Sequence, residues 1–171
     1  MKKSILILVL NLVLLLTFGI SVQAQNKEVA TSATTSFYAT SKVVPLGEGR
    51  LYMSYEALGV TVSDTGEGLF HGATVRSLGG MLIEKGIYKD EQGWGVFNLQ
   101  NGDKVFITYK AAGESKPGGV GIAKGTSTFT GGTGKCAGIQ GSFEWTRYTP
   151  RSSIEGVGQS YIKGNVKYKL P

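Results

Sequence analysis

The sequence is poor in the residues on which disulfides, metal sites and most nucleophilic catalysis depend. It has one cysteine, Cys136, and one histidine, His71, in 171 residues. A single cysteine cannot form a disulfide within its own chain, which excludes a disulfide-stapled miniprotein. A zinc site would have to draw its other ligands from carboxylates, and no serine lies in a Gly-x-Ser-x-Gly motif. We therefore expect no metal, no cofactor and no assignable catalytic residue.

Long apolar runs are also scarce, because only residues 5–22 form one. A short basic start, Met1 to Lys3, precedes this run, and Val22 and Ala24 follow at positions −3 and −1 of a cut before Gln25. This order of regions is typical of a secretory signal peptide. We expect residues 1–24 to be removed and the mature chain to be secreted or periplasmic. No later run approaches the roughly 20 residues that a membrane-spanning helix needs, so we expect no membrane span in the mature chain.

Charge of one sign does not dominate. Residues 25–171 carry 16 Lys and Arg against 12 Asp and Glu, and the basic residues are dispersed. The densest group, Lys163, Lys167 and Lys169, shares one face of an apparent strand. Such a group is more typical of a solvated face than of a polyanion site, so we expect no nucleic-acid partner.

Glycine, in contrast, is abundant, with 25 residues in the 147 after the expected cut. It is mixed with six Phe, eight Tyr and two Trp, a composition typical of many bent strands rather than of disorder. Side chains alternate along most of the chain, and no segment of 12 or more residues after residue 24 has helical spacing. We expect a lead-in at residues 25–35 and one all-β domain, a sandwich or a closed barrel, at residues 36–171.

Individual strands follow from this alternation and from turn residues. The pair Asn101 and Gly102 predicts a hairpin between residues 94–99 and 104–110. Between residues 51 and 62 the apolar residues change parity at Gly59, which predicts a β-bulge there. Turns are expected at residues 45–49, 63–68, 89–93, 113–119 and 150–158. The remaining strands are expected at residues 36–44, 69–77, 80–88, 120–129, 139–148 and 162–170.

Residues 125–141, GTSTFTGGTGKCAGIQG, form the most distinctive motif. The stretch resembles the glycine-rich corner between two strands of allene oxide cyclase and dirigent-like barrels. The resemblance implies an eight-stranded antiparallel barrel, lipocalin-like in outline, with an apolar lumen for a small hydrophobic molecule. Cys136 departs from the bulky apolar residue common at its place, and no catalytic residue matches. The corner also imitates nucleotide motifs, but Cys136 stands where a P-loop needs Ser or Thr, and no helix follows.

Aromatic side chains on the strands suit the wall of a concave site, and we take Tyr55, Trp94, Tyr109 and Trp145 as candidate ligand-binding residues. Glu56 is a fifth candidate. If the apolar face of its strand packs outward, Glu56 points into the lumen, and if the apolar face lines the lumen, Glu56 is a surface carboxylate. Arg76 and Arg147 each fall within an expected strand, and either of them balances a buried carboxylate or is solvated.

Three functions stay open. The first is binding of a small hydrophobic or phenolic molecule, the second is a cyclase or isomerase that holds its substrate in a folded pose, and the third is a packed barrel with a structural role. A homo-oligomer is compatible with each of them.

Overall fold

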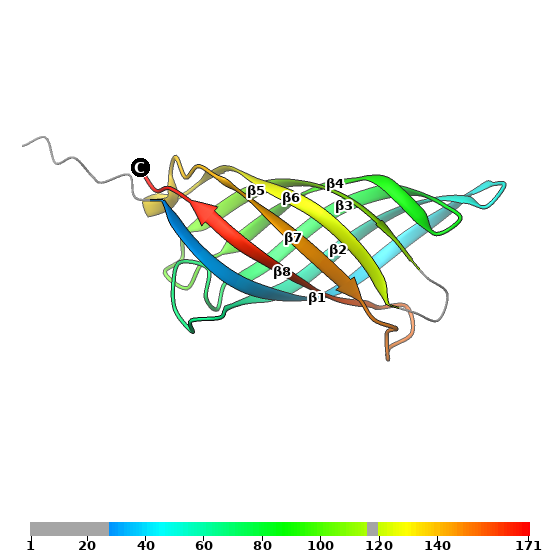
Figure 1. Cartoon of the computed structure of the whole chain (residues 1–171), viewed down its shortest axis with the longest axis horizontal. Coiled ribbons are helices and arrows are strands. Elements are labelled where there is room, and N and C mark those ends of the chain that lie inside the picture. The colour runs from blue at the N-terminus through cyan, green and yellow to red at the C-terminus, as the bar shows by residue number, and fades with distance from the viewer. Residues whose placement is uncertain (1–27, 116–119) are drawn as a thin grey trace, which may run out of the picture.

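The chain forms a closed, eight-stranded antiparallel β-barrel, as expected from the sequence. The computed structural model describes residues 28–115 and 120–171; the expected signal peptide lies outside them. Each strand pairs with the next, and β8 closes the ring against β1 (Figure 1). The strands are β1 (Val29–Gly47), β2 (Arg50–Ser63), β3 (Thr74–Glu84), β4 (Ile87–Asn98), β5 (Lys104–Glu114), β6 (Gly121–Gly132), β7 (Ser142–Thr149) and β8 (Gly158–Tyr168).

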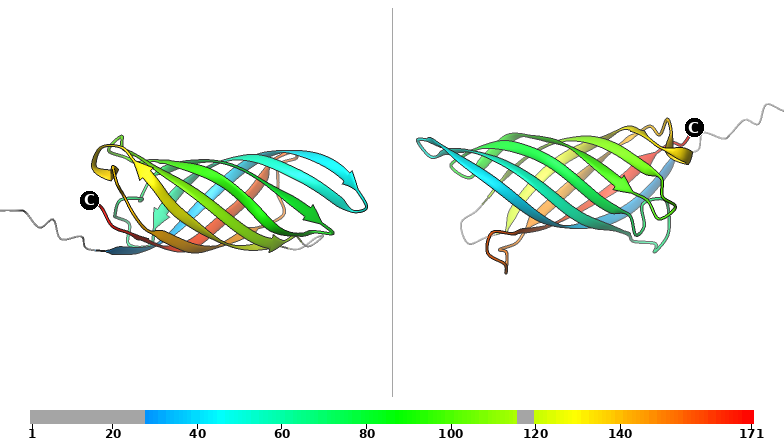
Figure 2. Two further views of the ribbon diagram at one scale, coloured as in Figure 1. Left: turned by 90° about the horizontal axis from the view of Figure 1, so that it is seen from above. Right: turned by 180° about the vertical axis from the view of Figure 1, so that it is seen from behind.

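β1 and β2 are the longest strands, and their hairpin projects beyond the rest of the barrel at the end away from the C-terminus (Figures 1 and 2). β1 begins at Val29, so residues 29–35, expected in the lead-in, belong to a strand that pairs with β2 and β8. The bulge expected at Gly59 is absent, because the register of β1 and β2 runs without a shift from Ala33 to Pro45. The change of parity instead leaves Leu58, Val60 and Val62 on the outer face, each about half exposed.

The region between residues 69 and 99 differs most from the sequence-based strands. β3 begins only at Thr74 and runs without a break through Leu78 and Gly79, the two residues between the expected strands 69–77 and 80–88. The turn lies at Lys85 and Gly86, which both have positive φ. β4 then includes residues 89–93, which were expected as a turn. The glycines in these strands are packing positions rather than chain reversals.

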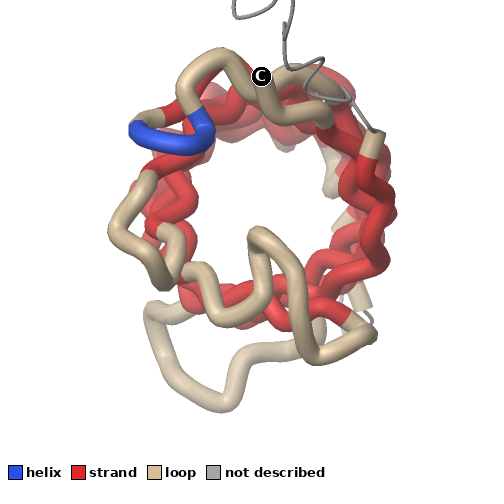
Figure 3. The backbone as a smooth tube through the Cα atoms, turned by 90° about the vertical axis from the view of Figure 1, so that its left-hand side faces the viewer, coloured by secondary structure: helices blue, strands red, loops and turns tan. Residues whose placement is uncertain are grey.

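One end of the barrel, near the C-terminus, is packed with aromatic side chains. Phe70 comes from the loop between β2 and β3 and is 1 % exposed. Its ring centroid lies 5.1 Å from that of Phe97, 5.7 Å from Phe129 and 5.5 Å from Tyr168. Figure 3 looks down the barrel at this end and shows loop segments crossing part of the ring of strands. The packed rings around Phe70 close this end of the barrel.

The glycine-rich motif turns the chain between β6 and β7 at this same end. It contains the short 3-10 helix η1 (Gly134–Cys136), and Gly134 and Gly138 have φ values of 53° and 82°. Cys136 is fully buried beneath the turn, and burial, with Asp103 nearby, raises the pKa of its thiol. The motif is therefore a corner, as its residues predict. No helix among the described residues is long and apolar enough to cross a membrane.

Candidate functional site

The other half of the barrel contains a cavity of about 310 Å³. Its lining includes Ser41 from the second half of β1, Met81 near the end of β3 and Gly158 at the start of β8. These positions place the mouth at the end opposite the C-terminus. An eight-stranded barrel is wide enough either to be filled by its own side chains or to hold one small ligand. Here side chains fill the closed end, whereas the open half has room for one small ligand.

The cavity exists because glycine stands opposite four of its large aromatic side chains. The pairs across neighbouring strands are Phe37 with Gly59, Tyr55 with Gly79, Tyr109 with Gly93, and Trp145 with Gly125. A Cβ atom on any of these glycines would overlap the ring opposite. Each ring therefore leans over the neighbouring strand instead of filling the middle of the lumen, a packing known from aromatic and glycine pairs in sheets.

A β-bulge in β4 brings two polar side chains to the cavity wall. Tyr88 pairs with Gly113 and Glu91 with Ala111, so β4 has one residue more than β5 between these pairs. In a regular strand without a bulge, residues 88 and 91 are three positions apart and would face opposite sides of the sheet. The bulge turns both inward, where Tyr88 is 7 % exposed and Glu91 is 0 % exposed.

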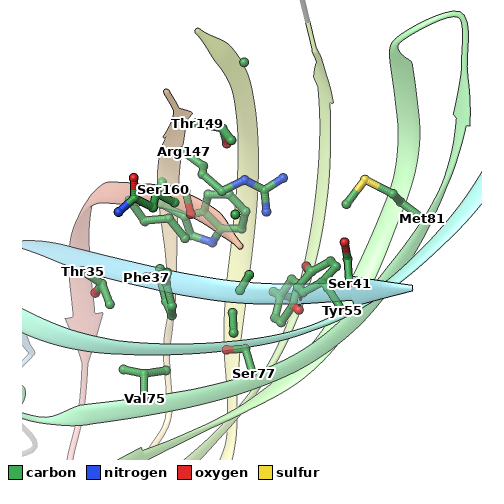
Figure 4. A pocket seen from close by; sticks show the side chains of 18 of the residues that line it. Thr35, Phe37, Ser41, Tyr55, Val75, Ser77, Met81, Arg147, Thr149 and Ser160 are labelled. Carbon is green, nitrogen blue, oxygen red and sulfur yellow. Dashed lines mark hydrogen bonds between the residues drawn. The ribbon is translucent and has the colours of Figure 1, made fainter. Parts of the chain in front are cut away.

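Glu91 forms an ion pair with Arg147 of β7. Nη1 of Arg147 lies 2.5 Å from Oε1 of Glu91, and Nη2 lies 2.6 Å from Oε2. The two residues are three strands apart, roughly 14 Å around the wall, and the positions between them carry only Ala or Gly. Their side chains meet across that gap, and in Figure 4 the guanidinium of Arg147 reaches toward the side of the cavity with Tyr55 and Met81. The small residues along the two rows are Ala111, Gly113, Ala123 and Gly125.

Three tyrosines extend this polar cluster. Tyr55 donates to Oε1 of Glu91, and the Tyr55 and Tyr109 hydroxyls are 2.9 Å apart. Nη2 of Arg147 donates to the hydroxyl of Tyr88 at 2.9 Å. Among the described residues, every buried side-chain nitrogen and oxygen has a hydrogen-bond partner. The cluster therefore meets the condition under which buried polar groups are tolerated.

The cluster fixes the charge states at neutral pH. Burial, and then the charge of Glu91, raises the pKa of Tyr55 far above its ordinary value. Burial raises the pKa of Tyr109 to about 12 and also raises that of Tyr88. For Arg147, burial opposes the charge, but hydrogen bonds and the charge of Glu91 outweigh it, so that its pKa is raised. All three tyrosines are neutral donors, and the guanidinium is charged.

The structure brings three of the five predicted site residues together. Tyr55, Tyr109 and Trp145 line the cavity, and Nε1 of Trp145 donates to Oγ of Ser127 at 2.9 Å. The prediction that Trp94 lines the lumen is wrong, and of the two alternatives left open for Glu56 the structure shows the surface carboxylate, because both residues lie on the outward-facing positions of their strands. Trp94 is 66 % exposed, and Glu56 pairs at 2.6 Å with Arg76 on the outer surface.

Neither Glu91 nor Tyr88 is among the site residues predicted from the sequence. Glu91 lies in the polar run Lys89, Asp90, Glu91, Gln92, Gly93, which has the composition of a turn, and only the bulge gives it an inward position. The one signal for this pair is Arg147, a charged residue within an expected strand that, like Arg76, either balances a buried carboxylate or is solvated. His71, expected in a strand, lies in the β2–β3 loop, where Nδ1 accepts from the Ser63 amide at 3.4 Å.

Within residues 28–115 and 120–171, no group of three or more His, Cys, Asp and Glu side chains could hold a metal ion. The fold and cavity define the class, a closed eight-stranded antiparallel barrel with one open end. Comparison with family models, with curated proteins and with solved structures finds no match for this chain. The resemblance of the corner to allene oxide cyclase and dirigent-like barrels therefore stays a prediction that rests on that motif.

Proposed function

We propose that this is an exported barrel that binds one small hydrophobic or phenolic molecule in its lumen. The observation that carries the proposal is the cavity of about 310 Å³, open at one end and closed by the Phe70 cluster at the other. Its volume lies at the lower end of the range of small-molecule sites, roughly 300 to 1,000 Å³. Its wall is mainly apolar, and its polar side chains are the Arg147 cluster, serines and threonines of several strands, Glu114 and Gln159. This distribution is typical of sites that bury an apolar body and orient it by few polar contacts.

The two tryptophans of the chain provide a direct test. Trp145 lines the cavity, whereas Trp94 lies on the outer surface. In a Trp94→Phe variant all tryptophan fluorescence comes from the lumen, and in a Trp145→Phe variant all of it comes from outside. Titration with a panel of fatty-acid and phenolic probes should quench or shift the emission of the first variant and leave that of the second unchanged. Equal responses of the two variants would contradict binding in the lumen.

Native mass spectrometry of the protein purified from an exporting host complements this test. A discrete mass that is lost on denaturation would identify the molecule that occupies the lumen, and a chain that begins at Gln25 would support export. A bare protein mass, together with no fluorescence response to the panel, would leave a barrel whose function resides on its surface.

The alternative of a cyclase- or isomerase-type enzyme is favoured by one observation, the polar cluster in the cavity wall. Glu91 is a carboxylate within the barrel, but it is 0 % exposed, and both of its oxygens accept hydrogen bonds. An enzyme of this type would therefore use tyrosine hydroxyls as donors and the cavity wall to hold the substrate in one pose. Mass spectrometry of the released ligand decides, because an enzyme converts it on repeated incubation and a carrier returns it unchanged.

A further inference from the structure

The directions of the hydrogen bonds in the cluster show which polar atoms remain for a ligand. The hydrogen of the Tyr55 hydroxyl is used on Glu91, and the single hydrogen of the Tyr109 hydroxyl has two acceptors within reach, the Tyr55 oxygen at 2.9 Å and the Leu78 carbonyl at 3.3 Å. Hydrogen bonds among the described residues use three of the five N–H groups of Arg147, two on Glu91 and one on Tyr88. An arginine can only donate.

Tyr88 is the member of the cluster with a hydrogen to spare. Its oxygen accepts from Arg147, and no acceptor within the described residues takes its own O–H hydrogen. Tyr88 and Arg147 both line the cavity. The strongest acceptor of the cluster, the Glu91 carboxylate, is fully buried behind them. Around Arg147 the cavity wall therefore offers hydrogen-bond donors to a ligand and withholds the Glu91 carboxylate.

The charges of Arg147 and Glu91 restrict the net charge that a ligand can carry. The guanidinium of Arg147 is already neutralised by Glu91, in contacts of 2.5 and 2.6 Å. A ligand carboxylate would bring an uncompensated negative charge into the barrel, and burial of such a charge is costly. The serine and threonine hydroxyls of the wall can rotate to donate or to accept, so they do not select for one kind of ligand.

We propose that the lumen selects neutral hydrophobic carbonyl compounds, such as ketones or esters, whose carbonyl oxygen accepts hydrogen bonds from the Tyr88 hydroxyl and the Arg147 guanidinium. This inference rests on the proposed function, because it assigns the polar contact of the same ligand. The apolar part of the ligand then lies against the wall that Phe37, Val75 and Trp145 provide.

Three probes of one shape test the proposal, 2-acetylnaphthalene, 2-ethylnaphthalene and 2-naphthoate. The first has a carbonyl group where the second has a methylene, and the third has a carboxylate. Equilibrium dialysis against the full protein measures their dissociation constants. We expect the ketone to bind about tenfold more tightly than the hydrocarbon, as one net hydrogen bond predicts, and more tightly than the carboxylate. In Tyr88→Phe the advantage of the ketone over the hydrocarbon should fall toward one. Tyr38→Phe, on the outer surface and 56 % exposed, is the matched control and should retain it.

A spectroscopic measurement tests the contact without any variant. The carbonyl stretch of 2-acetylnaphthalene labelled with carbon-13 should lie at lower frequency in the complex than in hexane, because a hydrogen bond weakens the C=O bond. If ketone and hydrocarbon bind equally, or the stretch stays at its value in hexane, the inference is overturned and binding in the lumen stands. Tighter binding of the carboxylate would overturn the selection for neutral ligands. If none of the three probes binds, both the inference and the proposed function fail for ligands of this size.

Discussion

The closed end and the open half of the barrel are built from the same eight strands, but one is filled and the other is hollow. At the closed end the ring centroids of Phe97, Phe129 and Tyr168 each lie within 6 Å of the ring centroid of Phe70. In the open half the inward positions of β5 and β6 carry Ala or Gly between Glu91 and Arg147. The number of strands therefore permits a cavity, and the size of the inward side chains decides whether one forms.

The closed end and the open half also differ in what they contribute, stability in the first case and ligand binding in the second. Burial of large apolar side chains is the main source of folding free energy, and the closed end concentrates it. The open half instead holds a polar cluster whose net contribution to stability is small, since the desolvation of two charges offsets their attraction. We expect stability to depend mostly on the closed end and ligand binding mostly on the open half.

The largest expected effect is that of truncating the side chain that closes the barrel. Phe70→Ala should lower the free energy of unfolding by about 4 kcal/mol, because it removes a buried ring and leaves a cavity among three other rings. Phe37→Ala, at the wall of the existing cavity, should cost clearly less, since its ring already borders open space. Urea denaturation of both variants measures the difference. Equal losses of the free energy of unfolding in the two variants would contradict the expected difference between the closed end and the open half.

The second effect concerns the ion pair of the open half. Arg147→Met should cost about 3 kcal/mol, because it leaves the Glu91 carboxylate buried without its partner. The double variant Arg147→Met with Glu91→Leu should recover most of this loss, since neither charge then has to be desolvated. A double-mutant cycle from denaturation curves measures the coupling. A double variant as unstable as the single one would mean that the pair stabilises the open half as strongly as the rings stabilise the closed end.

The same division explains how far the sequence could predict the structure. Alternation and the Asn101-Gly102 turn predicted β5 and β8 well, because the faces of these strands differ clearly in polarity. The same pattern predicted one all-β domain, a sandwich or a closed barrel, and it placed Tyr55, Tyr109 and Trp145 on strands as candidates for the wall of a site. Alternation alone does not say which face is inside, and for this reason Trp94 was assigned to the wrong side and Glu56 was left open between the lumen and the surface.

The polar cluster could not be predicted from the sequence, because residues far apart along the chain define it. Glu91 faces the lumen only because of one extra residue in β4, and a bulge in a run of polar residues has the composition of a turn. Its partner is 56 residues further along the chain. Gly79 and Gly80 likewise resemble a turn in sequence, but they lie within β3 against the rings of Tyr55 and Tyr52. Such positions are defined by residues on other strands, which a single sequence does not pair.

A smaller effect compares one substitution at the two ends. Ala73 is 0 % exposed at the closed end, and Ala57 lines the cavity. Ala73→Leu should destabilise the protein by about 2 kcal/mol through overpacking, whereas Ala57→Leu should change stability by less than about 1 kcal/mol, because its side chain has space to enter. Ala57→Leu should also weaken binding of the probes measured by equilibrium dialysis. Similar costs at both positions, in parallel denaturation curves, would argue that the cavity closes up in solution.

The smallest expected effect tests whether the polar side of the open half is dry. Burial raises the pKa of Tyr109 to about 12 in the folded protein, against about 10 in an unfolded chain. The unfolded state therefore loses this proton first, and the stability that depends on it is fully present below pH 10 and is lost as the pH rises to about 12. Over this interval Tyr109 should contribute a slope of about −1.4 kcal/mol per pH unit. Urea denaturation between pH 9.5 and 11.5 should show a shallower decline in Tyr109→Phe than in the unmodified protein or in Tyr38→Phe. If Tyr109→Phe declines as steeply as the other two, water reaches the Tyr109 hydroxyl, and the polar side of the lumen is wet like its mouth.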